Sequence, residues 1–163
     1  MRSKGEPTVI ERRSVVEAPT DRVWQRVVSP EGINDELGPW MTMSMPRGAE
    51  SFTVDNVPVG IPIGRAWLRL FGVLPFDYDL LTIAELQPGR SFREESTMLS
   101  MSRWQHERSV TPDGDTKAVV HDRITFLPRF WLRFATPVLA AGIGALFGHR
   151  HRRLQRHLAV TTG

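Results

Sequence analysis

The segment from Pro137 to His157 constrains the fold most, because it predicts one long helix whose character changes halfway along. Pro137 suits a first helical turn, where its missing N–H costs nothing, and Thr136 before it is a candidate N-cap. Residues 138–147 are apolar all round, which predicts a helix buried on most sides. Residues 149–157 are basic and suit the negative end of the helix dipole. A helix of roughly 30 Å crosses a small domain, so we expect a curved sheet to wrap around it.

The apolar part of this helix leaves one alternative, a helix that spans a membrane. The uninterrupted apolar run supplies only about half of the ~20 residues that a spanning helix needs, and Arg129 and Arg133 lie just upstream. A buried core helix is therefore the preferred interpretation. Gly142, Gly144 and Gly148 each weaken the helix by about 1 kcal/mol relative to alanine, which predicts a close approach to a sheet or a ligand.

The basic end of the helix accounts for the positive charge of the chain. The formal net charge is +3, and this run holds four arginines. A solvated helix end is the preferred interpretation, and transient contact with an anionic membrane is the alternative. Nucleic-acid binding is not expected, because no aromatic residues interleave the cations. The four cations are Arg150, Arg152, Arg153 and Arg156.

Length and composition indicate one domain, residues 1–163, with a sizeable core. The chain has no cysteine, which excludes disulfides, thiol catalysis and cysteine-based zinc sites. Residues 1–7 are expected to be disordered. They are followed by no apolar core of a signal peptide, so a cytoplasmic location is the expectation.

Hydrophobic periodicity and turn residues predict seven strands and two short early helices besides the long one. The helices are expected to start near Thr20 and at Pro30. Residues Pro46–Ile63 are expected to form a long connection beside a binding site, in which only Ser51–Val54 could pair as a strand. The pattern of Arg65–Phe71 also fits a helix, and a strand is preferred. The strands are predicted at Thr8–Glu17, Trp40–Met45, Arg65–Phe71, Tyr78–Gln87, Ser91–Leu99, Arg103–Thr111 and Thr116–Leu127.

A row of polar residues is predicted on the inner face of the last three strands. The period of two places Glu94, His106, Arg108 and Asp122 among the bulky apolar residues, and the turns between the strands bring the four together. Isolated buried charges are costly, so these groups must pair or meet water. Three interpretations remain open: a buried ion-pair ladder, a ligand anchor, or acid–base chemistry in which Asp122 or Glu94 orients His106.

Large and adaptable side chains form a second signal. Aromatic residues and methionines at these positions are more often core than ligand contacts, but a curved sheet over one helix tends to leave a hollow. No metal site or cofactor fingerprint occurs, so neither a metal nor a cofactor is expected. The candidate ligand-binding residues are Trp24, Trp40, Met43, Trp67, Ser96, Met98, Trp104, His106, Phe126, Leu139 and Ile143.

The order of these elements resembles the helix-grip fold of the SRPBCC, or START-like, superfamily. That superfamily includes the birch pollen allergen and the polyketide cyclase/dehydrase group. The resemblance covers nearly the whole chain, and it rests on the order and spacing of soft motifs. The matching stretches are residues 18–24 (APTDRVW), 30–33 (PEGI), Phe92, 104–106 (WQH), Thr116 to Asp122, and 147–154 (FGHRHRRL).

The resemblance implies an α+β fold in which a curved antiparallel sheet of about seven strands surrounds the C-terminal helix. It also implies an apolar cavity for a lipid, polyketide or isoprenoid-like molecule, although members of one fold differ in activity. A carrier or sensor of a hydrophobic small molecule is the favoured hypothesis. The alternatives are a cyclase/dehydrase-type enzyme that uses the polar row and a membrane-surface protein that uses the basic helix end. Either a monomer or a homodimer is compatible with the sequence.

Overall fold

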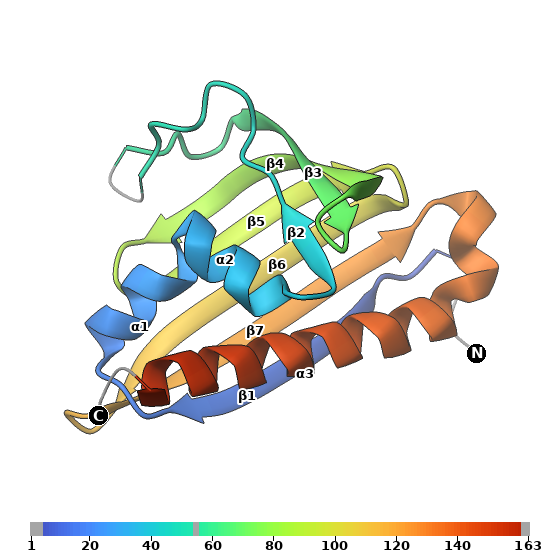
Figure 1. Cartoon of the computed structure of the whole chain (residues 1–163). Coiled ribbons are helices and arrows are strands. Elements are labelled where there is room, and N and C mark those ends of the chain that lie inside the picture. Colours follow the sequence, from blue (N-terminus) through green and yellow to red (C-terminus); the bar gives the residue numbers. More distant parts are fainter. Residues whose placement is uncertain (1–4, 54–55, 161–163) are drawn as a thin grey trace.

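A seven-stranded antiparallel sheet curls around the long C-terminal helix in the computed structural model, which describes residues 5–53 and 56–160 (Figure 1). The strand order is β1-β7-β6-β5-β4-β3-β2, and every neighbouring pair is antiparallel. This is the predicted helix-grip architecture. The strands are β1 Thr8–Val16, β2 Met41–Met43, β3 Pro62–Leu70, β4 Leu74–Gln87, β5 Ser91–Met98, β6 Met101–Asp113 and β7 Lys117–Pro128.

The helices all lie on the concave side of the sheet or at its end (Figure 1). Helix α1 (Thr20–Val27) leads into α2 (Pro30–Leu37), and α2 packs against α3 (Thr136–Val160). The start of α2 follows from local chemistry, because the Ser29 hydroxyl accepts a hydrogen bond from the backbone N–H of Gly32 and a proline occupies the first turn. A 3-10 helix, η1 (Phe130–Ala135), connects β7 to α3.

The predicted strands all occur, with shifted ends. Residues 65–70 lie in β3, which confirms the predicted strand except for its last residue, Phe71, which lies in the following turn. Strand β4 begins four residues earlier than expected, because the chain reverses in a tight turn where Phe71 (φ 52°) and Gly72 (φ 77°) both take left-handed conformations. Residues 51–53 form no strand, so that prediction is wrong for them, and its last residue, Val54, lies outside the described residues. Residues 1–4 of the segment predicted to be disordered also lie outside them.

The sequence-based picture of the long helix is wrong in two respects. Thr136 is not an N-cap, because it continues directly from η1 and its hydroxyl donates to the carbonyl of Arg133 at 2.7 Å. The apolar half is not buried on most sides, since Val138 is 74 % exposed, whereas Arg150 and His151 in the basic half are buried. Two residues of the basic half of α3, Arg150 and His151, therefore lie in the protein interior, and much of the apolar half faces outward.

Helical periodicity explains this inversion. Leu154 follows Phe147 by seven residues and Leu158 follows Leu154 by four, so the three side chains share one face of the helix, and all are buried. Arg150 and His151 fall on the same face, so the packing of these apolar side chains carries them inside. They can stay there because buried carboxylates receive them, as described below.

Helix α3 is also part of a stretch that is long and apolar enough to cross a membrane, by length and composition alone. The stretch is Phe130–Ala159. The mean hydropathy of an 18-residue segment within it is 1.5, and 11 % of that segment is buried. The face of α3 that packs on β1 and α2 anchors it within the fold. Gly144 and Gly148 both lie close to the side chain of Arg12 on β1, which donates two hydrogen bonds to the carbonyl of Gly144, at 3.2 and 3.1 Å.

Candidate functional site

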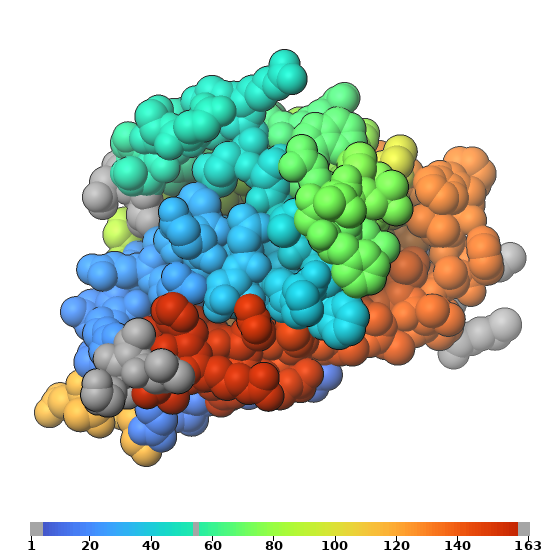
Figure 2. All heavy atoms as spheres, viewed as in Figure 1, coloured from blue at the N-terminus to red at the C-terminus, as the bar shows by residue number. Residues whose placement is uncertain are grey.

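A cavity of about 270 Å³ lies between the inner face of the sheet, helices α1, α2 and α3, and the irregular segment after β2. Figure 2 shows the molecule hollowed between that segment, in teal, and the blue helices. Most of the lining is apolar. The apolar lining includes Val27, Ile33, Leu37, Met41, Met43, Met45, Ala49, Phe52, Leu68, Leu81, Ile83, Leu86, Phe92, Met98, Trp104, Leu146 and Phe147.

Polar side chains meet at one part of the cavity wall: Asp79 of β4, Glu94 of β5, His106 of β6 and Arg150 of α3. Glu94 and His106 are direct cross-strand partners, as the turn between their strands predicted. The Glu94 carboxyl accepts a hydrogen bond from Ser96 at 3.2 Å, and its other oxygen is 4.0 Å from Nδ1 of His106.

Two of these carboxyl groups have raised pKa values. Burial raises the pKa of Glu94 well above its usual range, and the neighbouring Asp79 carboxyl raises it further. Burial also raises the pKa of Asp79. Oδ1 of Asp79 is buried and has no hydrogen-bond partner among the described residues. The wall therefore offers a protonated carboxyl as donor and a free carboxyl oxygen as acceptor.

Asp122 fixes the tautomer of His106. Burial opposes ionisation of Asp122, but the Arg108 guanidinium holds the pKa of this carboxyl well below its usual range. Its Oδ1 lies 2.7 Å from Nε2 of His106, which must therefore carry the proton and donate. Burial lowers the pKa of His106, so the ring is neutral. The free electron pair of Nδ1 then faces the cavity beside Glu94.

Behind the cavity, Asp122 and Glu36 organise a buried network. Arg108 donates to both oxygens of Asp122 at 2.7 Å and to Glu36 at 2.8 and 3.0 Å. Arg150 donates to Glu36 at 2.9 Å. His151 donates to Asp122 at 2.7 Å, and its other ring nitrogen lies 2.7 Å from the Ser14 hydroxyl. Two guanidinium groups thus balance two carboxylates, which satisfies the requirement for burying charge.

The structure divides the predicted polar row into two parts. Glu94 and His106 face the cavity, whereas Arg108 and Asp122 lie behind it and hold the network together. Of the apolar candidates, three line the cavity: Met43, Met98 and Trp104.

The remaining candidates do not line the cavity. Trp40 and Trp67 are 53 % and 41 % exposed, because Trp40 packs on Phe71 and Trp67 lies on the outer part of β3 beside Tyr78. The other five are core or supporting residues. Trp24 packs on Phe92, Phe126 belongs to the central core, Leu139 and Ile143 pack against that core, and Ser96 holds Glu94.

Sequence reasoning missed five polar residues of the site and network: Ser14, Glu36, Asp79, Arg150 and His151. Asp79 had a signal, because it shares a strand face with Leu81 and Ile83, where a carboxyl is out of place. Arg150 had a weaker one, its helical spacing from Phe147 and Leu154. Glu36 had none, since helix α2 is polar on several sides.

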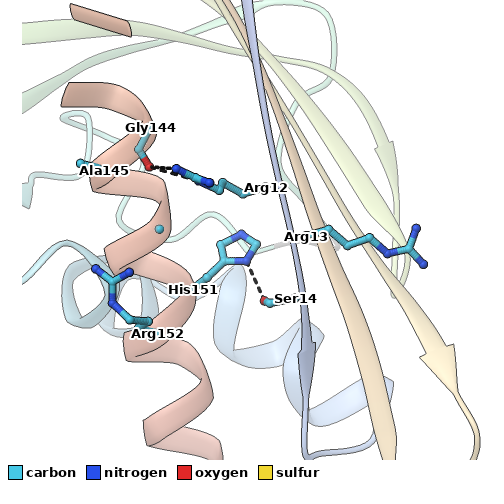
Figure 3. Close-up of a pocket in the computed structure, with 8 residues that line it drawn as sticks. Arg12, Arg13, Ser14, Gly144, Ala145, His151 and Arg152 are labelled. Atoms are coloured by element: carbon cyan, nitrogen blue, oxygen red, sulfur yellow. Dashed lines mark hydrogen bonds between the residues drawn. The ribbon is translucent and has the colours of Figure 1, made fainter. Parts of the chain in front are cut away.

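Two other possibilities at the protein surface and interior are not supported. The described part of the chain contains no group of three or more His, Cys, Asp or Glu side chains arranged to hold a metal ion. A separate groove of about 380 Å³ lies between β1 and α3 (Figure 3). In this groove Arg12 is already hydrogen-bonded to the carbonyl of Gly144, Arg152 lies beside Gly148 and Arg13 points away, so the three arginines do not form one anion site.

Replacing Glu94 by glutamine is expected to stabilise the fold at alkaline pH. The pKa of Glu94 lies above its ordinary value of 4.5 in the folded chain, so the folded chain keeps a proton that the unfolded chain releases. This contribution is complete below the unfolded pKa and is lost as pH rises through the folded pKa. We expect Glu94→Gln to melt roughly 2–4 °C higher than the natural chain near pH 9, and the difference to shrink toward pH 5.

The control for this measurement is Glu95→Gln, on the exposed opposite face of the same strand. In thermal unfolding followed by circular dichroism, the melting temperature of Glu95→Gln should change with pH in the same way as that of the natural chain. Parallel curves for Glu94→Gln and the natural chain would show that Glu94 is not protonated in the fold.

Solved structures of other proteins share this architecture at low sequence identity. The chain is similar to a START superfamily protein from Mycobacterium smegmatis, with 10 % identity, a TM-score of 0.70 and coverage of 94 % of this chain and 98 % of that one. It is similar to a norcoclaurine synthase from Thalictrum flavum (13 %, 0.64, 99 % and 100 %) and to an aromatase/cyclase from Streptomyces sp. R1128 (13 %, 0.60, 94 % and 98 %). These likenesses confirm the predicted START-like, helix-grip fold.

The sequence itself gives a family without an assigned activity. No curated protein matches the chain. One family model, described as a domain of unknown function (DUF8410), matches residues 14–158, which include every residue of the buried network and the cavity wall. The chain therefore belongs to the DUF8410 family, and it folds as a START-like helix grip.

Proposed function

We propose that this protein binds a hydrophobic small molecule that carries one polar group, of the lipid, polyketide or isoprenoid-like kind. The observation that supports this most is a largely apolar cavity whose ionisable side chains are gathered at one part of the wall. Its volume of about 270 Å³ is near the lower end of the ~300–1,000 Å³ found for small-molecule sites. The START-like neighbours, a cyclase and a synthase among them, support a ligand-binding use of the fold.

The polar wall favours a hydroxyl or carbonyl group on the guest. Glu94 supplies an O–H donor, while Nδ1 of His106 and Oδ1 of Asp79 supply acceptors. A hydroxyl group can donate to one acceptor and accept from Glu94 at the same time. Arg150, the one cation among the described lining residues apart from the neutral His106, is paired with Glu36, so a neutral polar group on the guest fits best.

A second candidate function is acid–base catalysis on such a guest. The supporting observation is the fixed tautomer of His106, which places a basic nitrogen 4.0 Å from a carboxyl oxygen of Glu94. A base next to a protonated acid is the arrangement that removes a proton from a carbon beside a carbonyl and delivers one to a leaving hydroxyl. Ring closure with loss of water, as in a cyclase/dehydrase, would need both steps.

The experiment is native mass spectrometry of the freshly purified protein, followed by denaturing extraction of any guest. We expect a co-purified hydrophobic molecule in the natural chain and in Leu80→Trp, whose side chain lies on the face away from the cavity. We expect Leu81→Trp, which fills the cavity, to lower guest occupancy by at least about tenfold at an unchanged fold. The same guest in all three proteins would place binding elsewhere and contradict the proposal.

Incubation of the protein with an added polyketone or lipid separates the two functions. A carrier returns an added polyketone or lipid unchanged after incubation, whereas a cyclase/dehydrase returns a product that has lost water. If no guest co-purifies and a panel of lipids and polyketides gives no rise in melting temperature, the cavity serves neither function.

A further inference from the structure

Most of the large exposed apolar side chains lie at one end of the sheet, which we call the apolar end. Strand register defines it: Met41 pairs with Leu70, Leu70 pairs with Leu74, and Met101 pairs with Pro128. The start of β2 therefore lies beside the β3–β4 turn, and Trp40 there also contacts His149 in the middle of α3. The β5–β6 turn lies beside η1, because the backbone N–H of Arg129 donates to the carbonyl of Ser100 at 2.9 Å. The exposed residues of the apolar end are Trp40, Leu70, Phe71, Val73, Leu74, Phe76, Leu99, Phe130, Trp131, Phe134 and Val138.

The exposure at this end is extreme for such side chains. Phe130 is 81 % exposed, Phe134 is 84 % and Val73 is 78 %. Figure 2 shows the green residues of the β3–β4 turn and the orange residues of η1 on the same side of the molecule. Contiguous apolar surface of this kind is rare on a protein that stays free in water, and it marks an interaction surface.

The charges at the apolar end select the partner. Segments 40–43, 67–77, 97–103 and 128–142 contain four arginines and one acid, Asp77, which is buried. Arg69, Arg103 and Arg133 are exposed, and Glu6, just before β1, is the exposed acid nearby. The surface thus combines aromatic rings with cations. Aromatic side chains favour the boundary between lipid and water, and arginines favour anionic headgroups.

We propose that the apolar end docks on an anionic lipid bilayer. Phe130, Trp131, Phe134 and Val138 enter the interface, and Arg69 and Arg133 meet the headgroups. A second copy of the chain fits this end less well, because a two-fold contact would place the same arginines against each other. The proposal is independent of the guest in the cavity.

This surface differs from the basic helix end that the sequence suggested for membrane contact. Arg150 is buried against Glu36, and Arg153 donates to Asp35 at 3.0 Å, so these two charges are engaged within the fold. Arg152 and Arg156 remain exposed, about 20 residues along α3 from η1. The two ends of one helix therefore offer two membrane contacts that an experiment can separate.

The test is flotation of the full chain with phosphatidylcholine vesicles, with and without phosphatidylglycerol. We expect binding to the anionic vesicles, and a loss of at least about tenfold in the double variant Phe130→Asp/Phe134→Asp. Ile61→Asp, at a 57 % exposed site near the opposite end of β3, should bind like the natural chain. Arg69→Gln/Arg133→Gln should remove the preference for anionic lipid. Circular dichroism melts confirm that each variant folds.

Three results would overturn the proposal. The first is no flotation of the natural chain with either kind of vesicle. The second is loss of binding in Arg152→Gln/Arg156→Gln with full binding in Phe130→Asp/Phe134→Asp, which assigns the contact to the basic helix end. The third is a dimer in sedimentation velocity that Phe130→Asp/Phe134→Asp dissociates, without vesicle binding, which assigns the surface to a second copy.

Discussion

Asp122→Asn is expected to lower the free energy of unfolding by about 3–5 kcal/mol at neutral pH. The Asp122 carboxylate is fully buried and accepts hydrogen bonds from Arg108, His106 and His151. Asparagine keeps the size of the side chain but removes its charge, so the buried Arg108 guanidinium loses one of its two carboxylate partners. Urea unfolding followed by tryptophan fluorescence measures the change. Asp113→Asn, at the exposed end of β6, should stay within about 0.5 kcal/mol of the natural chain.

The pH dependence gives this prediction a second readout. The pKa of Asp122 is lower in the folded chain than in the unfolded chain, so its contribution is present above the unfolded pKa and is lost as pH falls through the folded pKa. The stability gap between Asp122→Asn and the natural chain should therefore narrow in acid. A gap below about 1 kcal/mol at neutral pH would show that Arg108 finds other partners.

Glu36→Gln is expected to cost a similar amount, about 3–5 kcal/mol, because one carboxylate serves two buried guanidinium groups. Removing its charge leaves Arg108 with Asp122 alone and leaves Arg150 without its ion pair. The double variant Glu36→Gln/Arg150→Met should recover part of the loss, since the stranded cation is gone. Glu31→Gln, exposed on the same helix, should change stability by less than about 1 kcal/mol.

A double-mutant cycle over Glu36 and Arg150 tests the reason given for this loss. The two single variants should together lose more free energy of unfolding than the double variant loses, because the two residues share one interaction. Strictly additive energies would mean that Glu36 stabilises α2 without regard to α3, which would contradict the network described here.

The polar row could be predicted because its information is local. In a strand the side-chain direction follows from the period of two, and short turns set the pairing, so Glu94, His106 and Asp122 were placed together from sequence alone. The strand ends were less exact, because turns such as the one at Phe71 and Gly72 depend on backbone conformations that many residues can adopt.

The basic half of α3 was misplaced because its partners are distant in sequence. The fate of Arg150 depends on Glu36, 114 residues away, and that of His151 depends on Asp122 and on Ser14, 137 residues away. A charged helix end next to such partners is buried, and the same sequence without them is solvated. The prediction that the apolar half is buried on most sides was wrong for the complementary reason, since nothing in that segment specifies what covers its outer face.

The spread of the buried network along the chain has a consequence for recognising related proteins. Its members occupy β1, α2, β6, β7 and α3, and each element contributes only one or two of them. No short continuous sequence motif contains such a set, so a comparison of short motifs will not detect it. Superposed structures can be compared instead by whether the same side chains meet at the same place, which distinguishes close kin from chains that share only the helix grip. The diagnostic set is Ser14, Glu36, His106, Arg108, Asp122, Arg150 and His151.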